Sequence, residues 1–269
     1  MKRAFGDIAE GQIHYWHGGT GQVPLVYVPP GPGTARHQVP LSGVLARGRR
    51  VIVPDIPGMG DSVAPPDSLG VVGLDWFADA LHRFLDGLGV GAIDLLGSSL
   101  GGGICIEMAR QRPDRVRHLI LNRVVVRQGD ERVEMRKRHA PEVHPEASGA
   151  YVMFVWNRMR NLYTYFPWFK TAAANLRKAD LPPPEILHVS LIEHLKMCAT
   201  SHKAFTAYYD YPFAERLSQI AVPTMARADA VTAIPGAREW QPAYEGDPLM
   251  AKPESLEPLA AQIAAFLDG

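Results

Sequence analysis

One serine in this chain has the surroundings that nucleophilic chemistry needs. The apolar run 93–96 leads into Gly97-Ser98-Ser99-Leu100-Gly101, and a pattern of helical spacing follows. A sharp turn from strand to helix strains the backbone at the central serine and projects its hydroxyl above the sheet, while flanking glycines avoid clashes across the turn. The N-terminus of the following helix offers N–H groups to a developing oxyanion. Ser99 is therefore the candidate nucleophile.

The segments around this turn alternate between strand and helix patterns. Apolar or alternating runs predict strands at 11–17, 24–28, 50–54, 93–96 and 118–126. Helical spacing of apolar residues predicts helices at 35–46, 74–88 and 253–267, in addition to the one after Ser99. Strands that alternate with helices in this way favour an α/β fold with a mostly parallel central sheet flanked by helices.

The alternation stops near residue 127 and resumes near residue 219. The segment 127–218 is rich in aromatic residues and methionine, and its patterns are mostly helical. We therefore expect a core of residues 1–126 and 219–269, with a helical cap of residues 127–218 above the strand ends. The aromatic residues favour an apolar or aromatic substrate, with Trp156 as the candidate contact, and they would equally suit an ordinary core between cap and sheet.

Composition excludes several classes of partner. The chain has 269 residues, of which 46% are hydrophobic and 21% charged, and its formal net charge is zero. Without a basic excess we expect no nucleic-acid or anionic-membrane partner. No apolar run approaches the roughly 20 residues that span a bilayer. The partner that we expect is a small-molecule substrate.

Compartment and cofactor content can also be predicted. The N-terminus is charged and lacks the apolar stretch of a signal peptide. The two cysteines, Cys105 and Cys198, form no spaced framework, so we expect no disulfide and a cytoplasmic location. No histidine pair has metal-ligand spacing, and the complete Gly-x-Gly-x-x-Gly signal of a dinucleotide site is missing. We expect neither a metal nor another cofactor.

Four stretches together resemble a known family. They are the Pro/Gly loop 29–33, Asp55-Ile56-Pro57-Gly58-Met59-Gly60-Asp61-Ser62, the turn at Ser99, and Ile220-Ala221-Val222-Pro223-Thr224. Their order and spacing are similar to those of the α/β-hydrolase superfamily, in its capped type related to epoxide hydrolases, esterases, C–C hydrolases and haloperoxidase-like proteins. The resemblance implies the α/β-hydrolase fold with a helical cap. It also implies a catalytic set of nucleophile, histidine base and acid.

The resemblance assigns roles around Ser99. A serine at this position, where haloalkane dehalogenases and most epoxide hydrolases carry aspartate, suits acyl carbons. The family's oxyanion hole takes one N–H from the residue after the nucleophile, here Leu100. The second N–H comes from the loop 29–33, where prolines have none, so only Gly31 and Gly33 can donate, and Gly31 is nearer the expected position.

The acid and the base are harder to assign. The resemblance suggests Asp229 as the acid, about three residues earlier than usual, or else an acid near Asn122 or Asp130. Gly246 stands where the family places its histidine, and the chain has no histidine after His202. The spacing between Asp229 and Gly246 is also short, which predicts a missing or abbreviated strand. His37, just after the loop 29–33, is the candidate substitute base, and the lesser candidates are His139, His144, His188, His194 and His202.

Three functions follow from these residues. The first is a serine hydrolase that cleaves an ester, thioester, lactone or C–C bond through an acyl-enzyme on Ser99. The second is a cyclase, lyase, decarboxylase or isomerase that uses the cap cavity and the oxyanion hole with a degenerate triad. The third is a non-catalytic protein that binds a hydrophobic small molecule. Without a base, Ser99 would stay a neutral hydroxyl and a poor nucleophile.

Overall fold

The computed structural model describes residues 1–177 and 180–269, apart from the side chain of Asp229. Within these residues, eight strands form one sheet in the order β1-β2-β4-β3-β5-β6-β7-β8. The strand β2 pairs antiparallel with β1 and β4, and the other pairs are parallel. The sheet is therefore mostly parallel, as the sequence predicts. The strands are β1 (Lys2–Ile8), β2 (Gly11–Gly18), β3 (Leu25–Val28), β4 (Val51–Pro54), β5 (Ile93–Ser98), β6 (Val116–Arg123), β7 (Thr224–Ala226) and β8 (Arg238–Glu239).

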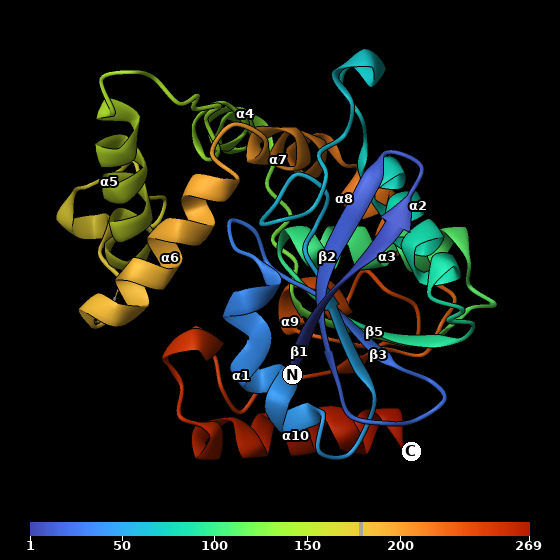
Figure 1. The fold of residues 1–269 in the computed structure, drawn as a ribbon. Coiled ribbons are helices and arrows are strands. Elements are labelled where there is room, and N and C mark those ends of the chain that lie inside the picture. The colour runs from blue at the N-terminus through green and yellow to red at the C-terminus, as the bar shows by residue number, and fades with distance from the viewer. Residues whose placement is uncertain (178–179) are drawn as a thin grey trace.

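Helices cover both faces of the sheet because buried strand residues alternate between two cores. On β3, Leu25 and Tyr27 belong to the core shared with α1 (Ala35–Leu45) and α10 (Pro253–Leu267). Val26 and Val28 belong to the core shared with α2 (Leu74–Gly87) and α3 (Leu100–Gln111). Figure 1 shows the sheet between these two layers. The α/β-hydrolase arrangement that we expected is thus present.

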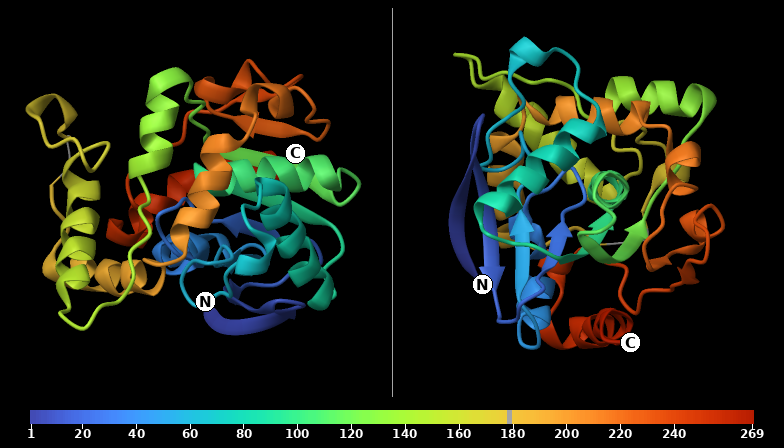
Figure 2. Two further views of the ribbon diagram at one scale, coloured as in Figure 1. Left: turned by 90° about the horizontal axis from the view of Figure 1, so that it is seen from above. Right: turned by 90° about the vertical axis from the view of Figure 1, so that its right-hand side faces the viewer.

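The segment predicted as the cap is helical. It contains α4 (Gly129–Arg138), α5 (Ala150–Thr164), α6 (Pro184–Lys196), α7 (Ser201–Asp210) and α8 (Phe213–Leu217). The helix α5 packs on α6, α4 packs on α7, and α7 reaches α2 and α3 of the core. In Figure 1, α4 and α7 lie at the end of the molecule opposite α10, and α5 and α6 lie to one side of the sheet. Figure 2 shows the same helices from two other directions.

Some elements differ from the expectation. The strand β1 was not predicted, because its residues are mostly exposed and Gly6 is the buried one, so no apolar alternation marks it. The strand β6 is shifted toward the N-terminus, from 118–126 to Val116–Arg123. The abbreviated strand expected before Gly246 is β8, only two residues long. The remaining helices are α9 (Ala228–Val231) and the 3₁₀ turns Asp67–Leu69, Ala173–Asn175 and Pro248–Met250.

Two further expectations concern the cysteines and the membrane. Cys105 and Cys198 are both buried and unpaired, so the predicted lack of a disulfide is confirmed. Burial raises the pKa of each thiol, which keeps both protonated. Across the described residues, every helix is too short or too polar to cross a membrane.

Candidate active site

The serine turn, residues 97–101, has the strained geometry that the sequence predicts. Ser99 lies between β5 and α3 with φ +50° and ψ −122°, and it is the only non-glycine residue with positive φ in the described part of the chain. A Cβ on Gly97 would lie 2.6 Å from the carbonyl oxygen of Gly101. A Cβ on Gly101 would lie 2.3 Å from the carbonyl oxygen of Val28. Only glycines fit at these two positions, and the strain is concentrated at Ser99.

Backbone donors stand beside this serine. Leu100 is the first residue of α3, so its N–H has no acceptor within the helix. Gly31 packs directly against it, since a Cβ on Gly31 would lie 2.8 Å from the Leu100 side chain. Both Gly31 and Gly33 line the same cavity as Ser99. These contacts agree with an oxyanion hole built from Leu100 and Gly31, a role that stays a prediction.

The cavity above Ser99 has a volume of about 560 Å³. Its floor is the serine turn, the loop 30–33, the end of β6 at Asn122 and Arg123, and the C-terminal loop 244–248. Its roof comes from the cap helices and carries aromatic and histidine side chains, which are His139, Tyr163, Phe166, His194, Tyr208 and Tyr209. A planar, mainly apolar molecule fits this lining.

The cavity wall also carries positive charge. Arg127 pairs with Glu131 at 3.0 Å and Arg227 pairs with Glu245 at 3.0 Å. Arg123 and Arg177 line the cavity without an ion pair among the described residues. Burial and the neighbouring charge of Arg123 lower the pKa of Arg177. The carboxylates of Asp180, Glu245 and Asp247 also line the cavity, so its wall carries charges of both signs, with Arg123 and Arg177 as the cations outside ion pairs in the described residues.

His37 lies on the cavity wall, but both of its ring nitrogens are engaged. Its Nδ1 accepts a hydrogen bond from the Thr34 N–H at 3.3 Å, so Nε2 carries the proton of the neutral ring. That Nε2 lies 3.4 Å from Ser190 Oγ on α6. No hydrogen bond joins His37 to Ser99 in the described residues, and its role as base stays a prediction.

A chain of hydrogen bonds continues from His37 across the cavity. Ser190 Oγ lies 3.0 Å from the hydroxyl of Tyr163 on α5. Tyr163 donates to Asp247 Oδ2 in the C-terminal loop at 3.2 Å. Burial and the Asp247 charge raise the pKa of Tyr163, which keeps it protonated and a donor. The cap is thus tied to the core on two sides, at α1 and at the C-terminal loop.

Trp156 is not on the cavity wall. The residues of α5 that line the cavity are Met159, Leu162 and Tyr163, all in the last two turns of the helix. Trp156 lies a turn earlier and is half-buried outside the cavity. Tyr163, which the sequence did not single out, lies on the cavity wall, where Trp156 was expected.

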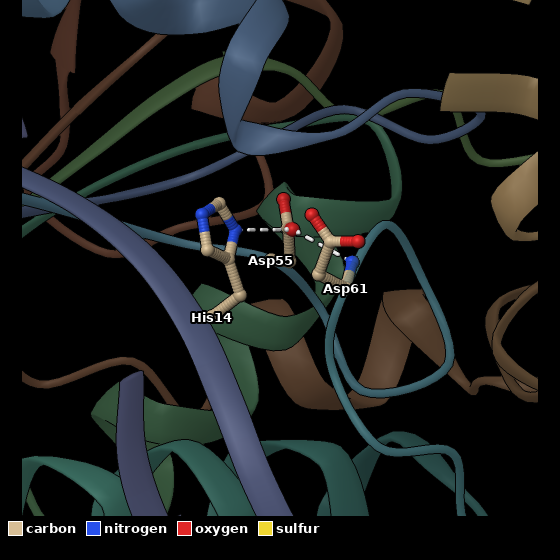
Figure 3. A group of neighbouring side chains, drawn as sticks. All are labelled: His14, Asp55 and Asp61. Carbon is tan, nitrogen blue, oxygen red and sulfur yellow. Dashed lines mark hydrogen bonds and ion pairs between the residues drawn. The ribbon is translucent and has the colours of Figure 1, made fainter. Parts of the chain in front are cut away.

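One cluster away from the cavity has the composition of a metal site. His14, Asp55 and Asp61 lie close together, as Figure 3 shows. Asp55 already accepts hydrogen bonds from His14 Nδ1 at 2.7 Å and from the Ala35 N–H at 2.6 Å. The exposed Asp61 pairs with the cations of Arg3 and Lys196. The cluster is therefore an internally compensated network that joins β2 to the start of α1.

Comparison with known proteins agrees with this architecture. Residues 23–137 match the family model described as the alpha/beta hydrolase fold. This segment contains the loop 29–33, the serine turn and the strands β3 to β6 that position them. Over this segment, and in the order of its strands, the chain has the α/β-hydrolase fold.

The curated relatives match only part of this chain. A 2-hydroxymuconate semialdehyde hydrolase of a Pseudomonas species is 43% identical over 77 residues, 29% of this chain and 26% of the relative. A 2-hydroxy-6-oxononadienedioate/2-hydroxy-6-oxononatrienedioate hydrolase of Burkholderia vietnamiensis is 36% identical over 121 residues, 43% of this chain and 41% of the relative. The chain thus matches between a quarter and about two fifths of the length of these relatives.

Solved structures match over nearly the whole chain. A thermophilic esterase from Thermogutta terrifontis has a TM-score of 0.70 and 24% identity, covering 100% of this chain and 98% of that one. An epoxide hydrolase from an endophytic Streptomyces has a TM-score of 0.72 and 18% identity, covering 100% of this chain and 95% of that one. At these identities the likeness shows the fold alone.

The described residues place glycine, rather than histidine, at the position of the usual base of an α/β-hydrolase. Gly246 lines the cavity, and a Cβ there would lie 2.5 Å from the Tyr244 hydroxyl. Asp229 lies in α9, but its side chain is outside the described residues, so its role as acid stays a prediction. Of the alternative positions, Asn122 lines the cavity, whereas Asp130 is exposed on α4.

Proposed function

We propose that this protein of the α/β-hydrolase fold is an enzyme that hydrolyses a bond next to a carbonyl group in a small, planar, mainly apolar substrate. The observation that supports this most directly is Ser99, held at positive φ on the floor of an aromatic-roofed cavity. The bond is that of an ester, a thioester or a lactone, or a carbon–carbon bond.

The relatives suggest a narrower substrate class. The Pseudomonas and Burkholderia relatives are named for substrates with a conjugated chain, a ketone or aldehyde, and one or two carboxylates. A cavity with aromatic walls and unpaired arginines suits such a molecule. We therefore propose a conjugated oxo-acid, cleaved at a carbon–carbon bond, as the first substrate class to test.

The chemistry follows from the positions of the groups. The Ser99 oxygen adds to the carbonyl carbon, and the N–H groups of Gly31 and Leu100 stabilise the oxyanion that forms. The oxyanion then collapses, the bond to the leaving group breaks, and an acyl ester remains on Ser99. Water adds to this ester and releases the acid. The serine turn and the loop 29–33 supply every protein group in this sequence of steps except the base.

No hydrogen bond joins Ser99 to a histidine among the described residues, so the proton of Ser99 has no histidine acceptor already in contact with it. In this proposal it passes to the leaving group, directly or through water in the cavity. General-base catalysis is worth roughly 10²–10⁴-fold in rate. We therefore expect turnover slower by about this factor than in a hydrolase with a complete triad.

A second candidate function is supported by a separate observation. The position of the family base is Gly246, and its neighbour Asp247 instead accepts a hydrogen bond from Tyr163 on the cavity wall. A tyrosine–carboxylate pair can move a proton on a bound substrate without an acyl-enzyme. A lyase, isomerase, cyclase or decarboxylase would use the cavity in this way.

Ser99→Ala separates the two functions. We expect a fluorophosphonate probe to label the wild type, and the wild type to turn over p-nitrophenyl butyrate and 2-hydroxymuconate semialdehyde, both followed by absorbance. Ser99→Ala should abolish labelling and turnover. Ser98→Ala, which changes the neighbouring serine of β5, should leave labelling in place because Ser98 is not at positive φ.

Turnover that survives Ser99→Ala would favour the second function. Ligand binding with no turnover of any substrate would contradict both and indicate a binding protein.

A further inference from the structure

A buried arginine in the cap lacks a counter-charge. Arg158 on α5 is 1% exposed. Its Nη2 donates to the His139 carbonyl oxygen at 3.3 Å, while Nε and Nη1 have no partner in the described residues. Burial lowers the pKa of Arg158 only to about 10, so the guanidinium stays charged at neutral pH. Buried charges are normally paired, because an unpaired one loses its hydration without compensation.

The groups around Arg158 supply no anion. Cys198 is one titratable neighbour of Arg158, and its thiol, whose pKa is raised by burial, is neutral. Burial, with the Arg158 charge as a further cause, lowers the pKa of His139 and of His194 to about 3. Both rings are consequently neutral. The described part of the chain contains no carboxylate that pairs with Arg158.

Two neighbours of Arg158 line the cavity, although Arg158 itself is not among the lining residues. His139 and His194 are 4% and 3% exposed, and both line the cavity wall. His194 Nδ1 donates to the Ser190 carbonyl at 2.8 Å, which leaves Nε2 without a partner, and His139 Nδ1 has none either. Four polar atoms are thus unsatisfied in the described residues, two on these histidines of the cavity wall and two on the buried Arg158 beside them. Native structures rarely leave such groups unpaired unless something else binds them.

We propose that Arg158, with His139 and His194, is a binding site for a carboxylate at the roof of the cavity. A carboxylate oxygen that enters between the two histidines accepts from the free guanidinium N–H groups and supplies the missing negative charge. The N–H groups of Nε and Nη1 are both unpartnered, and either can donate to a carboxylate oxygen. The carboxylate comes either from one end of the molecule in the cavity or from a free small acid.

This inference rests on the proposal that the cavity is the ligand site, and its test measures binding, which does not depend on Ser99 chemistry. Titration calorimetry compares benzoate with benzamide, its neutral analogue of the same shape. Wild type should bind benzoate at least tenfold more tightly than benzamide. Formate, added as a competitor, distinguishes the two sources: competition supports binding of a free small acid, and its absence supports a carboxylate carried on an apolar body.

Three variants locate the site. Arg158→Met, of similar length and without charge, should weaken benzoate binding at least tenfold and leave benzamide binding unchanged. The matched control is Arg160→Met, which changes an exposed arginine of the same helix and should bind like wild type. Arg177→Met tests the cavity arginine that has no ion pair. If Arg158→Met fails to fold, Arg158→Lys is the alternative variant. It keeps the positive charge but lacks the planar guanidinium, and it should weaken benzoate binding at least fivefold.

Several results would overturn the proposal. One is equal affinity of wild type for benzoate and benzamide. Another is benzoate affinity within twofold of wild type in Arg158→Met, or in Arg158→Lys where that variant is the one that folds. A third is loss of benzoate binding in Arg177→Met but not in the Arg158 variant, which would place the carboxylate among the arginines at the cavity wall.

Discussion

Gly101 shows how little space the serine turn leaves. A Cβ at this position would lie 2.3 Å from the Val28 oxygen and 2.4 Å from the Pro29 oxygen, and both are backbone atoms that cannot rotate away. We predict that Gly101→Ala lowers the free energy of unfolding by about 1–3 kcal/mol, as overpacking does. We also predict that it slows fluorophosphonate labelling of Ser99 at least tenfold. Urea unfolding and labelling rates measure the two effects.

Gly43→Ala is the control for this substitution. Gly43 lies inside α1, and nothing lies within 4 Å of a Cβ built on it. Alanine there should raise the free energy of unfolding by about 0.5–1 kcal/mol, because glycine loses more backbone freedom in a helix. If Gly101→Ala behaved like this control, the close packing at the serine turn would be disproved.

At the scale of residues, some features can be predicted from the sequence and others cannot. The strain at Ser99 follows from the glycines beside it, which are visible in the sequence. The burial of Arg158 does not, because Arg158 and the exposed Arg160 stand two apart on the same helix with the same side chain. Which of them is buried depends on where α6 and the core pack against α5. A local pattern does not contain that information.

Among the helices and strands, too, some features can be predicted from the sequence and others cannot. The strands β3, β4 and β5 are fully buried apolar runs, and they were predicted to within a residue or two. The edge strand β1 has its neighbour β2 on one side only, and its pattern is mostly polar. Its partner, rather than its own composition, makes it a strand. The cap was predicted as helical, but the residues that line the cavity, such as Tyr163, depend on the register of α5 against α6.

The attachment of the cap to the core gives a prediction for α5. The Tyr163 hydroxyl bonds to Ser190 on α6 and to Asp247 in the C-terminal loop. Tyr163→Phe removes both bonds and leaves two polar groups without this partner. We predict that it lowers the free energy of unfolding by about 1–3 kcal/mol, measured by urea denaturation.

Tyr151→Phe on the same helix is the matched control. Tyr151 is half-buried, and no hydrogen bond of its hydroxyl is found in the described residues. Its removal should change stability by less than about 0.5 kcal/mol. Equal effects of the two variants would mean that the contacts of Tyr163 do not hold the cap to the core.

The whole molecule has a formal net charge of zero, but its interior is unevenly charged. Arginines collect around the cavity, and several histidines are buried in neutral form. Burial lowers the pKa of His82 to about 4, and that of His139 and His194 to about 3. His82 Nε2 donates to the Met108 carbonyl at 3.1 Å, which satisfies the neutral ring. Protonating any of these rings inside the fold is therefore costly.

Stability should consequently fall as the solution becomes mildly acidic. Well above pH 6.5, the ordinary pKa of histidine, these rings are neutral in both states and contribute no pH dependence. Between pH 6.5 and about 4 the histidines of the unfolded chain bind protons, whereas those of the native state do not. The free energy of unfolding therefore decreases as pH decreases. Each histidine contributes up to about 1.4 kcal/mol per pH unit. Urea unfolding at pH 7, 6 and 5 measures the slope, which should be steepest between pH 6 and 5.

The assignment to particular histidines is tested by substitution. His82→Gln removes one of the three buried rings, so it should reduce by about a third the part of the slope between pH 6 and 5 that these rings contribute. His144→Gln changes a histidine whose side chain is 68% exposed, and its slope should equal that of wild type. A slope in His82→Gln equal to that of wild type would show that His82 is not held neutral. If the free energy of unfolding of wild type did not change between pH 7 and 5, none of the three histidines would be held neutral. Rings that take up protons only in the unfolded state must make stability depend on pH.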